Sequence, residues 1–418
     1  MEPAETIPVA DWMRHPAAVA VLSALAAGGH VGRFVGGAVR NHLLGLPVTD
    51  FDIASDAPPE RALALGRAAG LKAIPTGLEH GTVTLVVDRE PVEVTTLRRD
   101  VETDGRRAVV AFTDDWVEDA LRRDFTLNAV YLDADGTLYD PTGSGIADAR
   151  ARRIRFVGDP ETRIREDVLR ILRFFRFHAA YGRGALNADG QAACAALAPS
   201  MARLSGERIW KELSRLLVAP GAQDVLVSMA ETGVARHLWD GPVDAGRAAA
   251  LIDLEERHGL APDALRRLAA MVAEPDGAEA VAERLRLSKA EARRLALVLA
   301  TPADAPADDR ARRAAVYRHG AQAFADARLL RAAGTGEDEA ADGAADLAAD
   351  LALAAAWTAP VFPLGGEDVT RLGIPPGPRV GELLRRAEEW WIMGDFAADA
   401  ETCRAALARL ASEGGDRE

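Results

Sequence analysis

The residues most directly suited to chemistry are the two aspartates of Asp50-Phe51-Asp52. On a β-strand, side chains two positions apart point to the same face, so the two carboxylates would lie side by side with Phe51 turned away. Like charges this close repel each other unless a cation neutralises them, and magnesium is usually held by one or two carboxylates together with substrate phosphates. Because Asp-X-Asp also occurs in solvated turns, the tripeptide by itself indicates only a candidate metal site.

A glycine pair and a third acidic residue flank this motif in the sequence. Gly36-Gly37 precedes a helical stretch with Arg40 one turn in, which would offer backbone N–H groups and a positive helix end to a phosphate. Glu93, on the second arm of an expected hairpin, could add a third carboxylate, although such a residue alone is more often an exposed strand-face acid. Three carboxylates beside a phosphate-binding turn predict phosphoryl transfer with two metal ions.

Strands and helices must bring these residues together, and the sequence predicts both. The expected elements are strands over 30–35 and 50–54, a helix over 58–69, and a hairpin of strands over 82–87 and 92–97. The polar stretch 99–107 is expected to be mobile. From about Ala147 onward the β-like alternation gives way to Ala, Leu and Arg helices, and 340–356 is either a solvated helix or a flexible segment. The predicted fold class is therefore α+β, with a mixed sheet and helices first and an all-α remainder.

Several ordered segments resemble the motifs of the class II tRNA nucleotidyltransferases and bacterial poly(A) polymerases. The head-domain segments are Val35-Gly36-Gly37-Ala38-Val39-Arg40, Asp50-Phe51-Asp52-Ile53-Ala54, Gly81-Thr82-Val83-Thr84 and Glu93-Val94-Thr95-Thr96-Leu97-Arg98. Later family motifs are matched at 122–129, 152–160, 166–170 and 204–217, so the resemblance covers roughly residues 31–217. One departure is Asn41, where the family often has Asp; an amide there can still form hydrogen bonds, and the metal pair does not include it.

The resemblance implies a four-part organisation of the chain. It places a polymerase-beta-like nucleotidyltransferase head (mixed sheet with helices) at 1–145 and a helical neck with the nucleotide-selecting helix at 146–217. A helical body at 218–300 and a helical, tRNA-binding tail at 301–418 would follow.

The resemblance also implies roles for individual residues. Asp50, Asp52 and Glu93 would be catalytic, with Asp50 and Asp52 holding two Mg²⁺ ions. The nucleotide-binding set would be Gly36, Gly37, Arg40, Arg123, Asp124, Asn128, Asp167, Arg170, Arg173 and Arg176. Within it, Arg123 and Asp124 would contact the phosphate or ribose, and Asn128 would support them.

The stretch 163–177 bears on nucleotide selection. If it is one helix, Asp167 and Arg170 lie at i and i+3, with Arg173 and Arg176 continuing the same row. A carboxylate can accept from the exocyclic amine that cytosine and adenine share, while a guanidinium donates to ring acceptors; uracil and guanine present the opposite polarity. In the resembling family these residues would form an amino-acid template for C and A. The alternative is an i,i+3 surface ion pair, which is far commoner in proteins generally.

The function implied is template-independent addition of C, C and A to the tRNA 3′ end from CTP and ATP. Bacterial poly(A) polymerase is the main alternative, but those enzymes tend to end in a basic tail, and Gly366–Leu384 resembles the tail of CCA-adding enzymes. Partial CC- or A-adding enzymes are a second alternative, disfavoured because the segment Arg99–Phe112 is intact. A catalytically dead tRNA-binding protein is a third, disfavoured because Asp50, Asp52 and Arg170 are all present.

Composition sets the remaining expectations. The net charge is −14, yet residues 1–220 carry 27 Lys and Arg against 30 Asp and Glu, so most of the acidity lies beyond the motifs, and Arg150–Arg183 holds 10 Arg against 4 acids. A basic stripe for RNA therefore exists. Cys194 and Cys403 are too far apart in sequence to indicate a disulfide framework or a zinc site. No apolar run approaches the ~20 residues of a membrane span, so the expected location is the cytoplasm, with no membrane and no protein partner.

Overall fold

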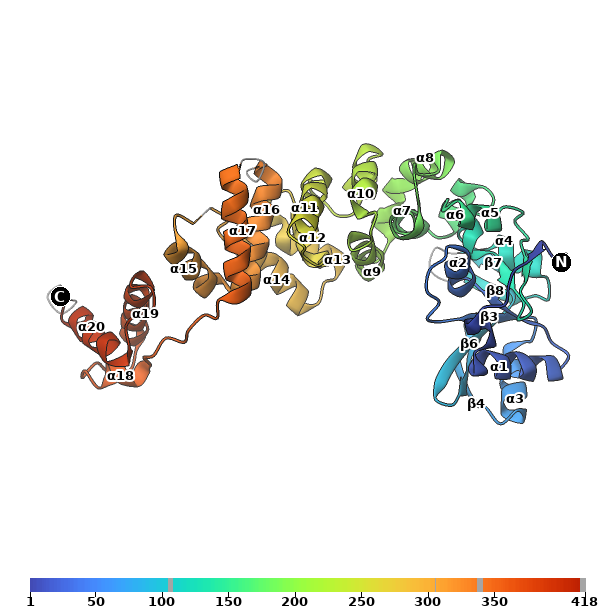
Figure 1. The fold of residues 1–418 in the computed structure, drawn as a ribbon, viewed down its shortest axis with the longest axis horizontal. Helices are drawn as coiled ribbons and strands as arrows, with labels where there is room; N and C mark the ends of the chain where they lie inside the picture. Colours follow the sequence, from blue (N-terminus) through green and yellow to red (C-terminus); the bar gives the residue numbers. More distant parts are fainter. Residues whose placement is uncertain (104–107, 305, 337–340, 414–418) are drawn as a thin grey trace. The chain divides into compact units, whose positions relative to one another are not determined.

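The computed structural model describes residues 1–103, 108–304, 306–336 and 341–413. The chain divides into two compact units, which are described separately. The N-terminal unit is Met1–Gly241 together with Glu283–Arg286, and the C-terminal unit is Pro242–Ala282 together with Leu287–Glu418. Figure 1 labels their elements.

The N-terminal unit begins with a mixed eight-stranded sheet in the order β1-β10-β9-β2-β3-β6-β5-β4. The strands are β1 Glu5–Thr6, β2 Gly32–Val35, β3 Asp52–Ser55, β4 Lys72–Gly77, β5 Thr82–Val87, β6 Glu90–Thr96, β9 Tyr131–Leu132 and β10 Thr137–Tyr139. The central pair β3–β6 is parallel, with Asp52 opposite Glu93, whereas β2–β3 is antiparallel, with Val35 opposite Asp52. This register brings the predicted third carboxylate next to the predicted pair.

Helices cover one face of this sheet, as Figure 1 shows for α1 and α3. The helices of the sheet region are α1 Pro16–Ala27, α2 Gly37–Leu43, α3 Pro59–Ala68 and α4 Trp116–Leu121, with short 3₁₀ turns at Asp11–Arg14, Leu78–His80 and Thr126–Asn128. Side chains of α1 and α3 pack with Phe34 and Ile53 in one core, while Ala54, Trp116 and Tyr131 form a second core. Since strand side chains alternate, Asp52 shares the face of Ala54 rather than that of Ile53.

Two expectations for this region need correction. The predicted strand over 50–54 begins only at Asp52, because its partner β2 ends at Val35 and the chain turns away at Gly36, which leaves Asp50 in the preceding loop. The predicted mobile stretch 99–107 is a strand where it is described: β7 Arg98–Thr103 pairs with β8 Ala108–Phe112, and residues 104–107 lie outside the described residues. The predicted hairpin is confirmed with a shorter, two-residue turn at Asp88 and Arg89, both with positive φ.

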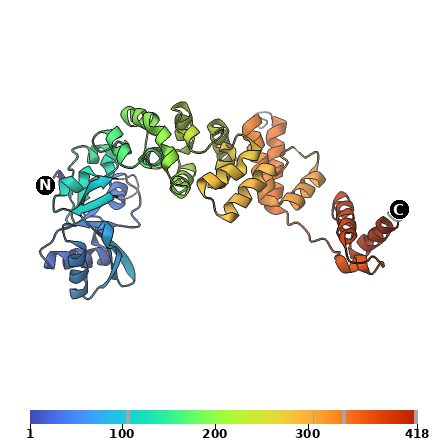
Figure 2. The same cartoon turned by 180° about the vertical axis from the view of Figure 1, so that it is seen from behind.

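Helices follow from Gly145 to the end of the N-terminal unit, as Figure 2 shows from behind. They are α5 Gly145–Arg150, α6 Pro160–Glu166, α7 Arg170–Tyr181, α8 Ala188–Leu197, α9 Gly206–Leu217 and α10 Ala222–Glu231, with 3₁₀ turns at Ala198–Arg203 and Ala235–His237. Phe174 and Phe177 of α7 pack against Phe125 and Phe156, with ring centroids of the Phe125–Phe177 pair 5.0 Å apart. This aromatic cluster fixes α7 beside the sheet region.

The expected single helix over 163–177 is wrong. It is interrupted between α6 and α7, and Asp167 is in an extended conformation with φ −147° and ψ 105°. Its carboxylate accepts a hydrogen bond from the Leu169 backbone N–H at 3.1 Å. Such a local side-chain bond competes with helical hydrogen bonding and ends the helix.

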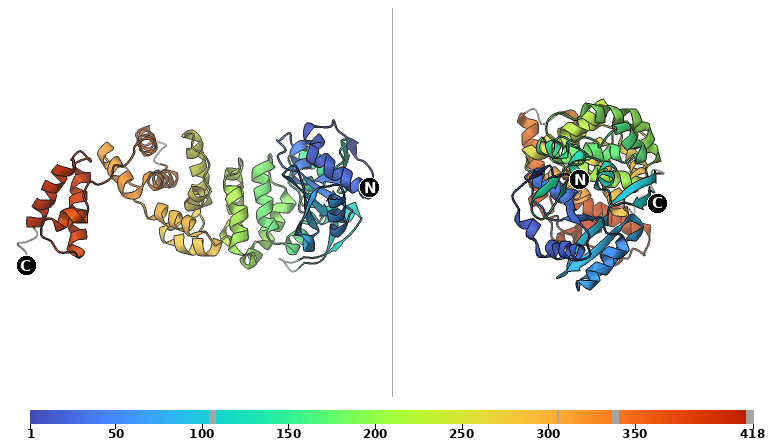
Figure 3. Two further views of the ribbon diagram at one scale, coloured as in Figure 1. Left: turned by 90° about the horizontal axis from the view of Figure 1, so that it is seen from below. Right: turned by 90° about the vertical axis from the view of Figure 1, so that its right-hand side faces the viewer.

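The C-terminal unit is helical, and the predicted all-α remainder is confirmed in the described residues. Together with the junction helix α13, its elements are α11 Ala245–Arg257, α12 Ala264–Met271, α13 Ala278–Leu285, α14 Lys289–Ala300, α15 Asp309–His319, α16 Ala321–Thr335, α17 Ala341–Ala356, α18 Gly366–Thr370, α19 Pro378–Met393, α20 Ala400–Glu413 and a 3₁₀ turn at Pro275–Gly277. Figure 3 shows these helices in two further views. The Ala- and Asp-rich stretch forms α17, which packs on α16. No helix of the described residues is long and apolar enough to cross a bilayer.

Candidate active site

The three predicted carboxylates meet where β3 begins beside the middle of β6. Asp50, Asp52 and Glu93 line one pocket of about 520 Å³, whose wall also includes Trp12 and His15. Solvent reaches the Asp52 side chain, yet crowding by the pocket wall raises the pKa of Asp52, and the charges of Glu93 and Asp50 raise it further, while Arg123 opposes this. A bound cation would relieve this repulsion.

The residues present fit a metal that is shared with a substrate. Within the described ranges, no three His, Cys, Asp or Glu side chains form a ready-made metal cage. Hard cations such as magnesium commonly use one or two carboxylates and complete their coordination with phosphates and water. The gathering of Asp50, Asp52 and Glu93 around one pocket is the observation that favours such a cation here.

The glycine turn lies directly beside Asp52. Gly36 follows the β2 residue that pairs with Asp52, and its φ of 68° with ψ of −121° is a conformation that is strained for any residue with a side chain. A Cβ at Gly36 would meet no atom within 4 Å, so backbone conformation rather than space requires glycine there. The turn therefore leaves the first N–H groups of α2 unobstructed next to the carboxylates.

Arg40 is bound by the protein rather than open to solvent. It is 8% exposed and donates to Asn41 at 2.9 Å, to Asn128 at 3.0 Å and to the Tyr181 hydroxyl of α7 at 3.1 Å. These contacts link the glycine turn to α7, and the role of Arg40 in nucleotide binding stays a prediction.

The departure at Asn41 has a structural consequence. Its amide oxygen accepts from Arg40, and its amide nitrogen donates to the carbonyl of Pro47 at 3.0 Å. Pro47 lies in the loop that leads to Asp50. A carboxylate at position 41 could accept from Arg40 but could not donate to Pro47.

A chain of polar contacts connects Arg40 to the helices. Asn128 donates to Asp124 at 3.0 Å, and Asp124 accepts from Arg173 of α7 through Nε at 2.9 Å. Burial acts to raise the pKa of Asp124, but the charge of Arg173 and the hydrogen bond from Asn128 outweigh it and lower the pKa. The structure therefore brings together four of the residues predicted to bind nucleotide.

Three further predicted residues, Asp167, Arg170 and Arg176, are held by partners that sequence reasoning did not assign to them. Arg208 of α9 donates to both oxygens of Asp167, at 3.0 and 2.8 Å. Arg170 binds Glu166 and the carbonyl of Arg122, and Arg176 binds the buried carboxylate of Glu212 on α9. For Glu212 a signal existed, since an acid amid the apolar residues of a strongly amphipathic helix needs a buried partner.

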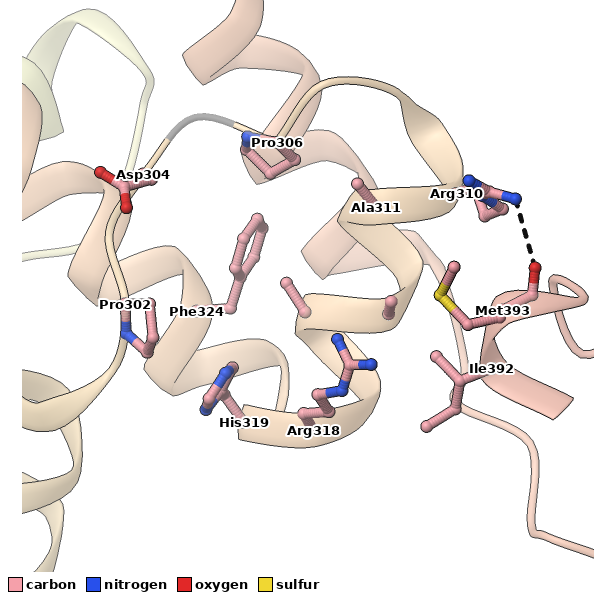
Figure 4. Close-up of a pocket in the computed structure, with 12 residues that line it drawn as sticks. Pro302, Asp304, Pro306, Arg310, Ala311, Arg318, His319, Phe324, Ile392 and Met393 are labelled. Atoms are coloured by element: carbon pink, nitrogen blue, oxygen red, sulfur yellow. Dashed lines mark hydrogen bonds between the residues drawn. The ribbon is translucent and has the colours of Figure 1, made fainter. Parts of the chain in front are cut away.

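A second hollow lies in the C-terminal unit and contains none of the predicted residues. Figure 4 shows it between α15 and the end of α19, with a volume of about 400 Å³. Phe324, Ile392 and Met393 give it an apolar wall, and Arg310 closes one side by donating to the Met393 carbonyl at 3.2 Å. It holds no acidic cluster comparable to that of the N-terminal unit.

Comparison with known proteins shows which domain families this part of the chain matches. Residues 32–155 match the Poly A polymerase head domain, and residues 186–241 match the probable RNA and SrmB-binding site of polymerase A. The candidate carboxylates and the glycine turn thus lie within a head domain of the poly(A) polymerase class.

Relatives along more of the chain define the family. The Mus musculus protein CCA tRNA nucleotidyltransferase 1, mitochondrial, is 35% identical over 376 residues, which cover 87% of this chain and 83% of that protein. The CCA-adding enzyme of Geobacillus thermodenitrificans is 40% identical over 223 residues, 53% of this chain and 54% of that protein. The crystal structure of the Bacillus stearothermophilus CCA-adding enzyme in complex with CTP, 29% identical, matches with a TM-score of 0.72 over 95% of this chain and 98% of that one. The chain belongs to the family of CCA-adding tRNA nucleotidyltransferases.

Proposed function

We propose that this protein adds C, C and A, in that order, to the 3′ end of tRNA, using CTP and ATP and no template strand. The observation that carries this proposal is the parallel register of β3 and β6, which sets Asp52 opposite Glu93 directly beside the Gly36 turn. Family membership supports it, as does the CTP bound by the solved relative from Bacillus stearothermophilus.

The carboxylates would serve the transfer step itself. In that step the 3′-hydroxyl oxygen of tRNA bonds to the α-phosphorus of the nucleotide, its proton is lost, and pyrophosphate leaves. Asp50 and Asp52 would hold two Mg²⁺ ions with Glu93 as the third carboxylate. When bound, the ions would activate the hydroxyl and neutralise charge on the triphosphate. The N–H groups after Gly36 and Gly37, with Arg123, would receive the phosphates.

Nucleotide choice would depend on the residues between the sheet and α9. Asp167 would accept from the amine of C or A, and Arg170 would donate to ring acceptors. In this proposal, Arg173 and Arg176 orient the group through Asp124 and Glu212, the partners they have in the structure. Asn128 and Arg40 complete the same polar chain.

We also propose that the protein is located in the cytoplasm. Because the mouse relative is mitochondrial, this proposal needs its own test, which cell fractionation provides.

The decisive experiment supplies tRNA ending at its discriminator base with CTP, ATP, or both. We expect two C residues with CTP alone and CCA followed by a stop with both nucleotides, abolished by a chelator of divalent metals. A long A tail would identify a poly(A) polymerase, and a product that stops after CC, or needs CC already present, would identify a partial enzyme.

A further inference from the structure

Asp119 of α4 is a buried carboxylate with an unusual number of donors. It is 1% exposed. Its Oδ1 accepts from Arg122 Nε and Nη2 at 2.9 and 2.6 Å and from the Arg98 backbone N–H at 3.2 Å. Its Oδ2 accepts from Arg123 Nε and Nη2 at 3.2 and 2.8 Å and from the Tyr131 hydroxyl at 2.6 Å.

Two of the three nitrogens of the Arg123 guanidinium contact Asp119. Nε and Nη2 form a two-point contact with Asp119, and the ring of Tyr131 lies 5.4 Å from the guanidinium carbon. The contact with Asp119 uses Nε and Nη2 and leaves Nη1 outside it, and the charge of Arg123 acts to lower the pKa of Asp52. A guanidinium that forms two hydrogen bonds along one edge cannot rotate freely. The direction of the third nitrogen of Arg123, Nη1, is therefore fixed.

We propose that Asp119 is a positioning residue for nucleotide transfer, which holds Arg123 so that its Nη1 meets the incoming triphosphate beside Asp52. The inference rests on the proposed function, because Arg123 is taken there to contact the nucleotide phosphate. It adds a residue outside the predicted site, one that acts through Arg123 and does not itself touch substrate.

Electrostatics agree with this geometry. Burial acts to raise the pKa of Asp119, but the charges of Arg123 and Arg122 and the hydrogen bond of Tyr131 outweigh it, so the pKa is strongly lowered. The carboxylate is therefore ionised at physiological pH. An Asn at this position has almost the same shape but only one acceptor atom, so it cannot retain both arginines.

The test is a double-mutant cycle measured by single-turnover incorporation of CTP and ATP. Asp119→Asn should lower kcat/KM for both nucleotides by about 100-fold, the cost expected when a positioning group shifts by about 1 Å. In an Arg123→Ala background the same change should alter kcat/KM by no more than about twofold, the scatter of independent mutations. Equal losses in the two backgrounds would show that Asp119 only supports the fold and would overturn the inference.

Matched variants keep the test decisive. Tyr131→Phe removes one donor from the same oxygen but leaves both Asp119–Arg123 hydrogen bonds, so its loss of kcat/KM should be much smaller than that of Asp119→Asn. Asp119→Glu, which retains the charge, should give a smaller loss than Asp119→Asn and serves as the cycle's first arm if the Asn variant does not fold. A wild-type protein that fails to extend tRNA would contradict the proposed function, whereas normal wild-type extension with additive variants would overturn only the role of Asp119.

Discussion

Arginine–carboxylate clusters occur in both units, and they differ in how far they are closed off from solvent. In the C-terminal unit, Asp350 is 0% exposed and joins Arg328, which is 1% exposed, to Arg312. In the N-terminal unit, Asp167 and Arg208 are each 30% exposed. The residue types are the same, but the side chains of the second cluster are much more exposed to solvent.

The difference in exposure predicts how strongly a mutation in each of these two clusters should affect stability. A buried pair that loses one partner leaves an uncompensated charge in a low dielectric, so the cost appears as stability. Mutation of a partly exposed pair lowers the free energy of unfolding only slightly, because water can replace the lost partner. Sequence composition cannot distinguish the two, and the predictions below use this contrast.

The largest effect is expected at the carboxylates. Asp52→Ala should reduce nucleotide incorporation by on the order of 10³-fold or more, because several kcal/mol of charge stabilisation by metal would be lost. Binding of tRNA should change little, since the carboxylates would hold metal rather than RNA. Gel-based incorporation and tRNA titration measure the two quantities, and near-normal turnover would remove the two-metal assignment.

Mutation of the buried cluster, in which Asp350 joins Arg312 and Arg328, should instead change the free energy of unfolding. Asp350→Ala removes the buried carboxylate that Arg312 and Arg328 share and should cost about 3–5 kcal/mol of unfolding free energy. Asp346→Ala is a matched control, because Asp346 binds the same Arg312 at 2.8 Å but is 51% exposed, and it should cost no more than about 1 kcal/mol. Denaturant unfolding of the full chain measures both, and equal costs would contradict the contrast between closed and open pairs.

Mutation of the partly exposed pair, Asp167 and Arg208, should change which nucleotides the protein incorporates. Asp167→Ala should slow CTP and ATP and weaken rejection of UTP and GTP by about 1–3 kcal/mol per lost partner, because the wrong base no longer leaves buried polar atoms unpaired. Glu161→Ala, at an exposed ion pair with Arg165, should leave selectivity unchanged. Single-turnover rates with the four nucleotides provide the measurement, and an unchanged CTP-to-UTP ratio would sink the template role.

A smaller effect is expected at Asn41. Asn41→Asp keeps an acceptor for Arg40 but loses the donor to Pro47, so the loop before Asp50 should loosen and kcat should fall by roughly 2- to 10-fold, equivalent to one ordinary hydrogen bond. The apparent KM for CTP should change less than kcat. Faster incorporation by Asn41→Asp would mean that the Pro47 contact does not position the loop.

The smallest change is one of pH. Because the native pKa of Asp124 is lowered, its stabilising contribution is fully present above the unfolded pKa of about 3.9 and is lost as pH falls through the native pKa. The difference in unfolding free energy between wild type and Asp124→Asn should therefore be constant from pH 5 to 8 and begin to shrink below about pH 4. A difference that grew on acidification would contradict the lowered pKa.

The sequence predicted the sheet region well because its signals are local. The Gly36 turn, the strands around Asp52 and Glu93, and the switch to helices each depend on neighbours in the chain. Even the meeting of Asp52 with Glu93 required only that the two strands pair, although the parallel pairing itself was not predicted.

The partners of the charged residues could not be predicted in this way. Arg208 and Asp167 are 41 residues apart, and Arg173 and Asp124 are 49 apart, so no periodicity connects them. The helix interruption at Asp167 was missed for a related reason: Arg163–Phe177 has helical spacing throughout, and only the tertiary contact with Arg208, together with the turn at Leu169, makes the extended conformation favourable.

The two cysteines offer a practical opportunity. Cys194 and Cys403 are both buried, and burial raises the pKa of each thiol, so neither presents a reactive thiolate at neutral pH. Fluorescent dyes can therefore be attached at introduced cysteines without first removing the natural ones. Glu60→Cys in α3 and Glu382→Cys in α19, both at exposed positions, would form a donor–acceptor pair for energy transfer, and the signal would report in real time whether the distance between the two units changes as nucleotides are supplied.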